Sequence, residues 1–227
     1  MHMRAVLFDL DNTLTHREKS IQRYAQHLIE CYKASLNGIH LEEVVTLIHR
    51  IDCGGYPKKE MLTHRSIAAS VAYALLSELN WVIKPSLEEL THFWFDQFGK
   101  NAVAMEGAEE LLKALQQLNL KLAVISNGGH ATRLEILNGL GFSHYFDVIM
   151  SSEKMGITKP NPEIFIQTCK LLDVEPIESL FVGDHPINDI QGAQNAGMKA
   201  LFLEGFHHTN LEVENRVSHL KDVLEFI

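Results

Sequence analysis

The chain has 227 residues, of which 46% are hydrophobic, so it is long enough to bury a substantial core in one domain or in two. Its 29 acidic residues against 20 basic ones give a formal net charge of -9, which repels polyanions such as nucleic acids. Three widely spaced cysteines without a CxxC pair disfavour a disulfide framework and a zinc knuckle, and indicate a reducing, cytoplasmic setting.

The first element is an apolar run, Ala5-Val6-Leu7-Phe8, that predicts a buried strand. Asp9 and Asp11 interrupt the apolar character directly afterwards. The run is therefore too short for a signal peptide or a membrane helix, and we expect no membrane partner.

Residues 14–101 contain no convincing strand but several amphipathic stretches, which predict a helical insertion. The stretches cover residues 21–36, 41–51, 59–79 and 87–98. Glycines and a proline at residues 54–57 predict a loop inside the insertion, and Ser86 predicts the N-cap of its last helix.

From residue 102 onward, apolar strand candidates alternate with leucines at helical spacing, such as Leu111, Leu112 and Leu115. The strand candidates are residues 120–125, 148–150, 180–182 and 200–203. Such alternation predicts an α/β fold, a Rossmann-like parallel sheet with helices on both faces. We expect residues 1–13 and 102–227 to form this core domain and residues 14–101 to form a separate helical domain.

Polar side chains follow the expected strands, at the edge of a parallel sheet where ligands gather. They are Asp9, Asp11 and Thr13 after the first strand, Ser126 and Asn127 after the second, Lys159 ahead of a later helix, and Asp184 and Asp189 after the fourth strand. Any one of them is as readily a helix cap or a turn residue. Several such positions in register indicate a site.

Carboxylates gathered in one crevice cannot all stay ionised without a counter-cation, because their repulsion raises some of their pKa values. Carboxylate oxygens are hard ligands, and a site that combines them with water and a phosphate oxygen favours Mg²⁺. Lys159 adds a fixed positive charge. These residues therefore suit a phosphorylated substrate.

A carboxylate neutralised in this way can attack phosphorus and form an acyl phosphate. Asp9 and Asp11 point to the same side of an extended strand, so one could attack while the other protonates the leaving oxygen and later deprotonates water. The Ser126 hydroxyl and backbone N–H groups could hold the phosphoryl oxygens.

Four motifs in order resemble those of the haloacid dehalogenase-like (HAD) hydrolase superfamily, over nearly the whole chain. The motifs are Asp9-Leu10-Asp11-Asn12-Thr13-Leu14, Ser126 in Ile125-Ser126-Asn127-Gly128, Lys159 in Thr158-Lys159-Pro160-Asn161-Pro162, and Gly183-Asp184-His185-Pro186-Ile187-Asn188-Asp189. The resemblance implies the phosphatase branch of the superfamily. It also implies that the insertion is a helical C1-type cap that closes over the site.

The resemblance further implies a role for each motif residue. Asp9 would be the nucleophile and a Mg²⁺ ligand, Asp11 the general acid and base whose backbone carbonyl also binds the metal, and Asp184 a further ligand. Asp189 would support the metal site from behind, and Thr13 would brace the first loop. The phosphate-binding residues would be Ser126, Lys159 and, through its backbone, Asn127.

Other functions stay open at this point. An aspartate at position 11 favours a phosphatase over a dehalogenase, but sugar phosphomutases of the same fold carry similar motifs. A phospho-accepting receiver module accepts phosphate on a later strand, which disfavours that alternative, and the intact motif set disfavours a catalytically silent binding module. The pair His207-His208 invites a metal hypothesis, but no H-x₃-H or HExxH arrangement supports zinc.

We expect the substrate to be a small phosphorylated metabolite and the protein to be a monomer or a homodimer. Specificity is expected to reside in the insertion, where five residues are candidate contacts, although an ordinary packing or surface role is the more common one for each of them. They are Arg17, Tyr24, Arg50, Tyr56 and Lys58.

Overall fold

The structure is a computed structural model that describes residues 3–209 and 215–227. The chain divides into two compact units, one formed by Met1–Thr15 with Ala104–Ile227 and the other by His16–Val103. Both boundaries lie two residues further along the chain than the expected ends at residues 13 and 101.

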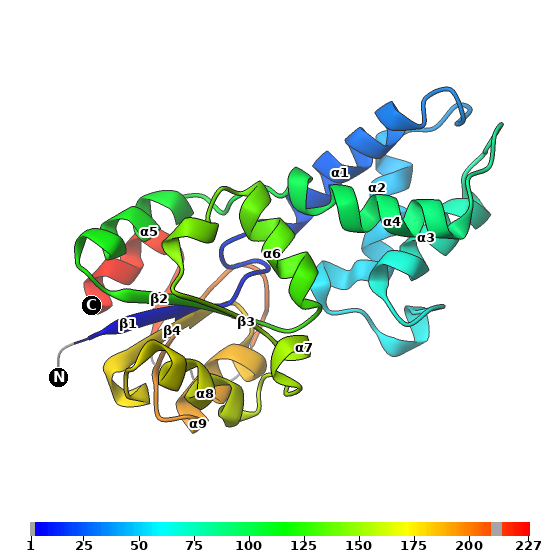
Figure 1. Ribbon diagram of the computed structural model, residues 1–227. Helices are drawn as coiled ribbons and strands as arrows, with labels where there is room; N and C mark the ends of the chain where they lie inside the picture. The colour runs from blue at the N-terminus through cyan, green and yellow to red at the C-terminus, as the bar shows by residue number, and fades with distance from the viewer. Residues whose placement is uncertain (1–2, 210–214) are drawn as a thin grey trace. The chain divides into compact units, whose positions relative to one another are not determined.

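The first unit is built on a six-stranded sheet in which every neighbouring pair of strands is parallel (Figure 1). The strands are β1 (Ala5–Phe8), β2 (Lys121–Ser126), β3 (Val148–Ser151), β4 (Ser179–Gly183), β5 (Lys199–Leu203) and β6 (Arg216–Val217). The expected α/β class is therefore confirmed, with all five expected strands present. The two-residue strand β6 was not expected, because so short a segment carries no hydrophobic period.

The strand order β3-β2-β1-β4-β5-β6 places β1 at the centre of the sheet. The chain extends to one side of β1 through β2 and β3 and then to the other side through β4 and β5. Open parallel sheets bind ligands at the carboxyl ends of the strands where the order reverses in this way. In this sheet the reversal lies beside β1, between β2 and β4.

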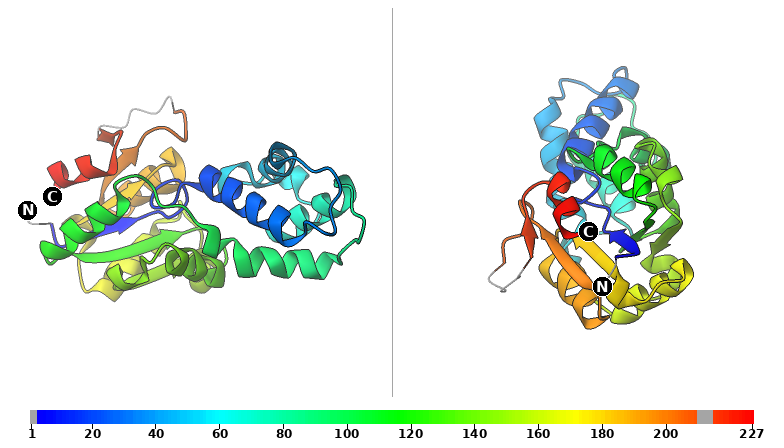
Figure 2. Two further views of the ribbon diagram at one scale, coloured as in Figure 1. Left: turned by 90° about the horizontal axis from the view of Figure 1, so that it is seen from above. Right: turned by 90° about the vertical axis from the view of Figure 1, so that its left-hand side faces the viewer.

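Helices cover both faces of the sheet (Figures 1 and 2). One face carries α5 (Ala108–Gln117) and the C-terminal 3₁₀ segment η7 (Leu220–Phe226), and the other carries α8 (Pro162–Leu172) and α9 (Gly192–Asn195). Alternation along β1 sends Ala5 and Leu7 into the buried cluster that includes Ile164 of α8. The remaining elements of this unit are α6 (His130–Gly139), α7 (Ser152–Met155) and the short segments η4 (Ser143–Tyr145), η5 (Pro176–Glu178) and η6 (Pro186–Gln191).

The second unit is helical throughout its described elements. These are α1 (Arg17–Cys31), α2 (Leu41–Asp52), α3 (Ile67–Glu78) and α4 (Leu87–Gln97), with short 3₁₀ segments η1 (Cys53–Gly55), η2 (Lys59–Met61) and η3 (Gly99–Asn101). The expected helical stretch 59–79 is divided, because α3 begins only after Ser66, whose side chain accepts the N–H of Ala69. Ser86 caps α4 in a capping box with Glu89, as its position predicted.

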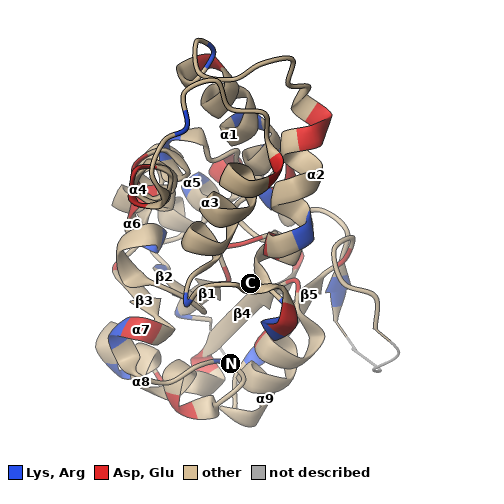
Figure 3. Cartoon of the chain, turned by 90° about the vertical axis from the view of Figure 1, so that its right-hand side faces the viewer, with Lys and Arg blue, Asp and Glu red and all other residues tan. Residues whose placement is uncertain are grey.

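Charges in α2 follow the helix dipole, with Glu42 and Glu43 in the first turn and Arg50 in the last. Figure 3 shows these as red and blue ends of the helix. Arg50 forms an exposed ion pair with Glu78 of α3. Such an exposed pair contributes little to stability.

Two of the candidate substrate contacts are packed inside the helical unit. Tyr24 is fully buried, with its ring centroid 4.9 Å from that of Trp94. Arg17 is 4% exposed and donates to both carboxylate oxygens of the buried Asp52, over 2.9 Å from Nε and 2.6 Å from Nη2. Both side chains therefore have structural partners within this unit.

No helix in the described part of the chain combines the length and the apolar character that crossing a lipid bilayer requires.

Candidate active site

The loop after β1 positions the first two acidic residues. The N–H of Asp9 donates to the carbonyl of Val182 on β4 over 2.9 Å, so the hydrogen bonding continues one residue past the strand. The chain then turns, because the carbonyl of Leu10 accepts from the N–H groups of Leu14 and Thr15. Asn12 takes a positive φ of 60° at this turn, a conformation that asparagine tolerates better than most residues.

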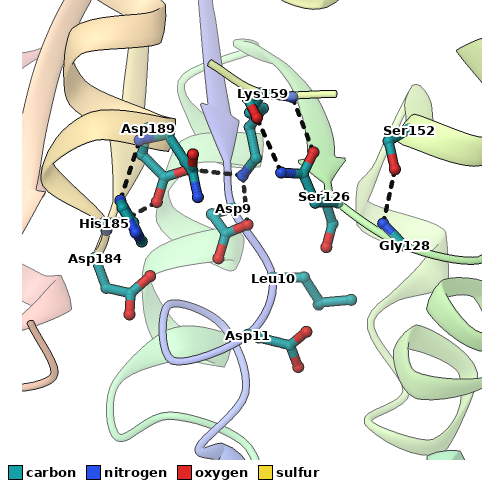
Figure 4. A network of polar contacts seen from close by, with 12 residues as sticks. Asp9, Leu10, Asp11, Ser126, Gly128, Ser152, Lys159, Asp184, His185 and Asp189 are labelled. Atoms are coloured by element: carbon teal, nitrogen blue, oxygen red, sulfur yellow. Dashed lines mark hydrogen bonds and ion pairs between the residues drawn. The ribbon is translucent and has the colours of Figure 1, made fainter. Parts of the chain in front are cut away.

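Lys159 lies between two buried carboxylates. Its Nζ is 2.6 Å from Asp9 Oδ1 and 2.6 Å from Asp189 Oδ1, and its side chain is 2% exposed (Figure 4). Burial alone would lower the pKa of Lys159, but the charges of Asp189 and Asp9 outweigh burial and raise it. The ammonium group stays charged and can offer one further N–H to a ligand.

Burial raises the pKa of Asp9 well above its ordinary value of 3.8. The Lys159 charge opposes this rise, and the nearby Asp189 and Asp184 carboxylates reinforce it. Asp9 Oδ1 is held by Lys159, whereas Asp9 Oδ2 is buried with no hydrogen-bond partner among the described residues. A second positive charge near Oδ2 would relieve both the burial and the repulsion.

Asp189 has both carboxylate oxygens occupied. Oδ1 accepts from Lys159, and Oδ2 accepts the backbone N–H of His185 over 2.9 Å. Gly183 leaves room for this carboxylate, since a Cβ added there would lie 2.5 Å from Asp189 Cγ. Asp189 therefore fixes both Lys159 and the loop after β4.

Asp184 follows β4 and has a side chain that is fully buried. Its Oδ2 lies 2.9 Å from Nδ1 of His207, and its Oδ1 has no partner among the described residues. Burial raises the pKa of Asp184 to about 6, even though His207 acts in the opposite direction. The hydrogen bond to Asp184 in turn raises the pKa of His207.

The arrangement of these carboxylates fits a divalent cation. Oxygens of Asp9, Asp184 and Asp189 lie within 4.8 Å of one another. Two of the buried oxygens in this cluster, Asp9 Oδ2 and Asp184 Oδ1, lack any donor in the described structure. Hard oxygen donors of this kind suit Mg²⁺ better than zinc or copper. The metal ligands expected from the sequence are Asp9, Asp184 and Asp11, with Asp11 contributing its backbone carbonyl. The cluster of carboxylates instead contains Asp189 beside Asp9 and Asp184.

Asn127, at the end of β2, is tied to the backbone of Lys159. Its Oδ1 accepts the N–H of Lys159 over 2.9 Å, and its Nδ2 donates to the carbonyl of Lys159 over 3.1 Å. The side chain of Asn127 therefore holds the backbone of Lys159 in place through both a donor and an acceptor. Ser126 is 2% exposed and lies beside it at the same edge (Figure 4).

Asp11 is turned toward a cation that the sequence did not point out. Arg133 of α6 places Nη2 3.2 Å from Asp11 Oδ2 and donates from Nε to Ser126 Oγ over 3.1 Å. One feature of the sequence could have pointed to Arg133, because this basic residue stands near the N-terminal end of a helix, where the partial charge is positive. A basic residue there is favourable only if anions or other acceptors surround it.

Thr13 is fully buried, and its Oγ1 has no hydrogen-bond partner among the described residues. The loop is closed instead by Thr15, whose Oγ1 donates to the carbonyl of Leu10 over 3.2 Å. Any bracing by Thr13 therefore comes from packing.

His207, which the sequence analysis mentioned only as part of a histidine pair, contacts the site through Asp184.

The sequence also matches known proteins. The profile described as haloacid dehalogenase-like hydrolase covers residues 6–203. Haloacid dehalogenase-like hydrolase domain-containing protein 3 of Mus musculus is 38% identical over 133 residues, 54% of this chain and 52% of that protein. Glyceraldehyde 3-phosphate phosphatase of Methanopyrus kandleri is 36% identical over 104 residues, 46% of this chain and 45% of that protein. The match thus spans about half the length of these two relatives.

A longer match, with lower identity, is N-acylneuraminate-9-phosphatase of Mus musculus. It is 28% identical over 204 residues, which are 87% of this chain and 81% of that protein.

Solved structures share the fold over the full chain. The magnesium-bound HAD-hydrolase YfnB of Bacillus subtilis superposes with a TM-score of 0.73 at 20% identity, covering 100% of this chain and 99% of that one. The L-2-haloacid dehalogenase of Xanthobacter autotrophicus gives a TM-score of 0.70 at 20% identity, covering 99% and 98%. With the fold, the four motifs and a profile match from residue 6 to residue 203 in agreement, the chain belongs to the haloacid dehalogenase-like hydrolase family.

Proposed function

We propose that this protein is a Mg²⁺-dependent phosphatase that hydrolyses a small phosphorylated metabolite through an aspartyl phosphate on Asp9. The observation that carries the proposal is the state of the Asp9 carboxylate. One of its oxygens is held by the buried Lys159, and the other is buried without a donor in the described structure. A buried carboxylate arranged in this way can attack a phosphorus atom whose phosphoryl oxygens are stabilised by neighbouring cations.

In the first half of the proposed reaction, an oxygen of Asp9 attacks phosphorus and the bond from phosphorus to the ester oxygen breaks. Lys159 and the Ser126 hydroxyl stabilise the charge on the phosphoryl oxygens. Asp11 donates a proton to the departing oxygen, so an alcohol leaves. Asp9 then carries the phosphoryl group, and Asp11 is a carboxylate.

In the second half, water attacks the same phosphorus and gives its proton to the Asp11 carboxylate. The bond from Asp9 to phosphorus breaks, which releases inorganic phosphate and restores the Asp9 carboxylate. Both active-site carboxyl groups end in their starting protonation states, so the cycle is balanced.

Asp9 and Asp184, together with the carbonyl of Asp11, would hold Mg²⁺, and Asp189 would keep Lys159 in place. When bound, the metal would supply positive charge to the phosphoryl oxygens and to the anionic cluster. The two oxygens without donors in the described structure, Asp9 Oδ2 and Asp184 Oδ1, support this assignment.

Relatives support the substrate class. They bear the names glyceraldehyde 3-phosphate phosphatase, phosphoserine phosphatase and N-acylneuraminate-9-phosphatase, all of which denote small phosphorylated compounds. We propose a substrate of this class for this chain.

The test is hydrolysis of p-nitrophenyl phosphate with Mg²⁺ by the wild-type protein and by Asp9→Asn. Asparagine keeps the size of the side chain but cannot form an acyl phosphate, so activity should fall to background while the circular dichroism spectrum is unchanged. Asp96→Asn, which changes an exposed carboxylate of α4, is the matched control and should keep full activity. Full activity of Asp9→Asn would contradict the proposal.

A panel of phosphorylated metabolites then separates phosphatase from phosphomutase activity. Release of inorganic phosphate identifies a phosphatase, whereas isomerisation of a sugar phosphate without phosphate release would identify a mutase. The proposal expects the first result.

A further inference from the structure

Arg133 contacts both Asp11, the general acid and base of the proposed reaction, and Ser126, which binds the phosphoryl group in that reaction. It is the fourth residue of α6, and its side chain reaches Asp11 in the loop after β1 and Ser126 at the end of β2. Helical side chains point back toward the N-terminal end of their helix, and here that end adjoins the loop after β2. The Arg133 side chain is only 11% exposed and that of Asp11 only 8%.

Three hydrogen bonds hold the guanidinium group. Nε donates to Ser126 Oγ over 3.1 Å, Nη2 donates to Asp11 Oδ2 over 3.2 Å, and Nη2 also donates to the carbonyl of Asn127. Asp11 and Arg133 are 122 positions apart in the chain, so the contact exists only in the folded sheet.

The hydrogen bond to Ser126 determines what its hydroxyl can do. A guanidinium group only donates, so Ser126 Oγ must accept in this contact. Its own hydrogen then points away from Arg133 and is left for another acceptor. A phosphoryl oxygen is the acceptor that the proposed reaction offers.

Room for the guanidinium is provided by Gly128. This residue has φ of 129°, and a Cβ added there would lie 2.6 Å from Arg133 Cζ and 2.6 Å from Nη2. Gly128 is itself held in place, because its N–H donates to Ser152 Oγ over 2.8 Å (Figure 4). The loop between β2 and α6 is therefore shaped around the Arg133 side chain.

We infer that Arg133 is a positioning residue, which orients the Asp11 carboxyl toward the leaving oxygen and the Ser126 hydroxyl toward the phosphoryl group. This inference rests on the proposed function. Proton transfer needs its donor within hydrogen-bond reach of the departing oxygen, and a side chain on a loop gains that precision from a fixed partner.

The experiment compares two aryl phosphates of similar shape in single-turnover rapid-quench measurements with Mg²⁺. Dinitrophenolate departs from 2,4-dinitrophenyl phosphate without needing a proton, whereas the more basic phenolate departs from phenyl phosphate with help from the general acid. In Arg133→Met, the rate of aryl release should fall by about threefold or less for 2,4-dinitrophenyl phosphate and by about 100-fold for phenyl phosphate. A residue that merely stabilises the fold would lower both rates equally.

Further variants sharpen the result. Arg133→Lys keeps the charge but lacks the planar fork, so it should show the same leaving-group dependence with a smaller loss. In an Asp11→Asn background, Arg133→Met should add little further loss with phenyl phosphate, because the two residues act through one proton transfer. Arg4→Met, which removes an exposed arginine paired with Glu178, is the matched control and should leave both rates unchanged.

Equal losses with both substrates, or full additivity with Asp11→Asn, would overturn the inference while leaving the phosphatase proposal intact. The phosphatase proposal fails separately, if the wild-type protein releases no phosphate or if Asp9→Asn retains activity.

Discussion

Replacing Asp184 with asparagine should stabilise the protein at neutral pH in the presence of EDTA, even though it removes a proposed metal ligand. The Asp184 side chain is fully buried, and burial raises its pKa from the ordinary 3.8 to about 6. Ionising it inside the folded protein is therefore harder than ionising it in the unfolded chain. Asparagine has no charge to bury and keeps the shape.

The size of the effect follows from the pKa difference. Each pKa unit corresponds to about 1.4 kcal/mol, so the difference amounts to roughly 3 kcal/mol once Asp184 is ionised in both states. Between pH 3.8 and about 6 the folded protein binds more protons at this group than the unfolded chain does. The contribution of protonated Asp184 to the free energy of unfolding is thus fully present below pH 3.8 and is lost as the pH rises through about 6.

The assay is urea unfolding in EDTA at about pH 4 and about pH 8, comparing wild type with Asp184→Asn. The two free energies of unfolding should be similar at the lower pH, and the variant should be more stable by up to about 3 kcal/mol at the higher pH. Asp96→Asn, which changes an exposed aspartate of α4, controls for the substitution itself and should change the free energy of unfolding by no more than about 0.5 kcal/mol. A variant that is less stable than wild type at about pH 8, or a difference that is the same at both pH values, would refute the reasoning.

Three further changes test other parts of the site. Gly183→Ala should abolish activity, because the new Cβ would lie 2.5 Å from Asp189 Cγ. Gly129→Ala is the control and should be tolerated, because the nearest neighbour of its added Cβ lies at 3.7 Å. An active Gly183→Ala variant would contradict the role given to Asp189. Lys159→Met should lose phosphatase activity and about 3 to 5 kcal/mol of stability in urea unfolding, because it leaves the buried carboxylates of Asp9 and Asp189 without their cation. A loss of stability below about 1 kcal/mol would be inconsistent with Lys159 neutralising these two carboxylates. EDTA should abolish turnover and Mg²⁺ should restore it, whereas restoration by zinc alone would overturn the metal assignment.

The sequence predicted the sheet well because buried parallel strands are continuous apolar runs. Residues 5–8 and 148–150 were expected as strands, and β1 and β3 contain them. The register between strands was not predictable, since it depends on pairing between distant segments such as Phe8 with Val182. That pairing is what brings Asp9 beside Asp184.

The site was predictable where a motif names the residue and not where a contact depends on side-chain direction. Asp9, Lys159 and Asp189 were expected on motif grounds, and the structure brings them together. Arg133 and His207 stand outside those motifs, and only the folded sheet places them against Asp11 and Asp184. The contact of the Asp11 carboxylate with Arg133 was not predictable either, because it depends on the turn after β1 and on a residue 122 positions away.

The most direct test of the proposed mechanism is to find the phosphoryl group on the protein. Wild-type protein is mixed with Mg²⁺ and 2,4-dinitrophenyl phosphate, quenched in acid during the first turnover, digested and analysed by mass spectrometry. The mechanism predicts one phosphoryl group on the peptide that contains Asp9, labile to hydroxylamine as an acyl phosphate is, and no label in Asp9→Asn. A phosphoryl group on a different side chain, or phosphate release at the wild-type rate by Asp9→Asn, would contradict it.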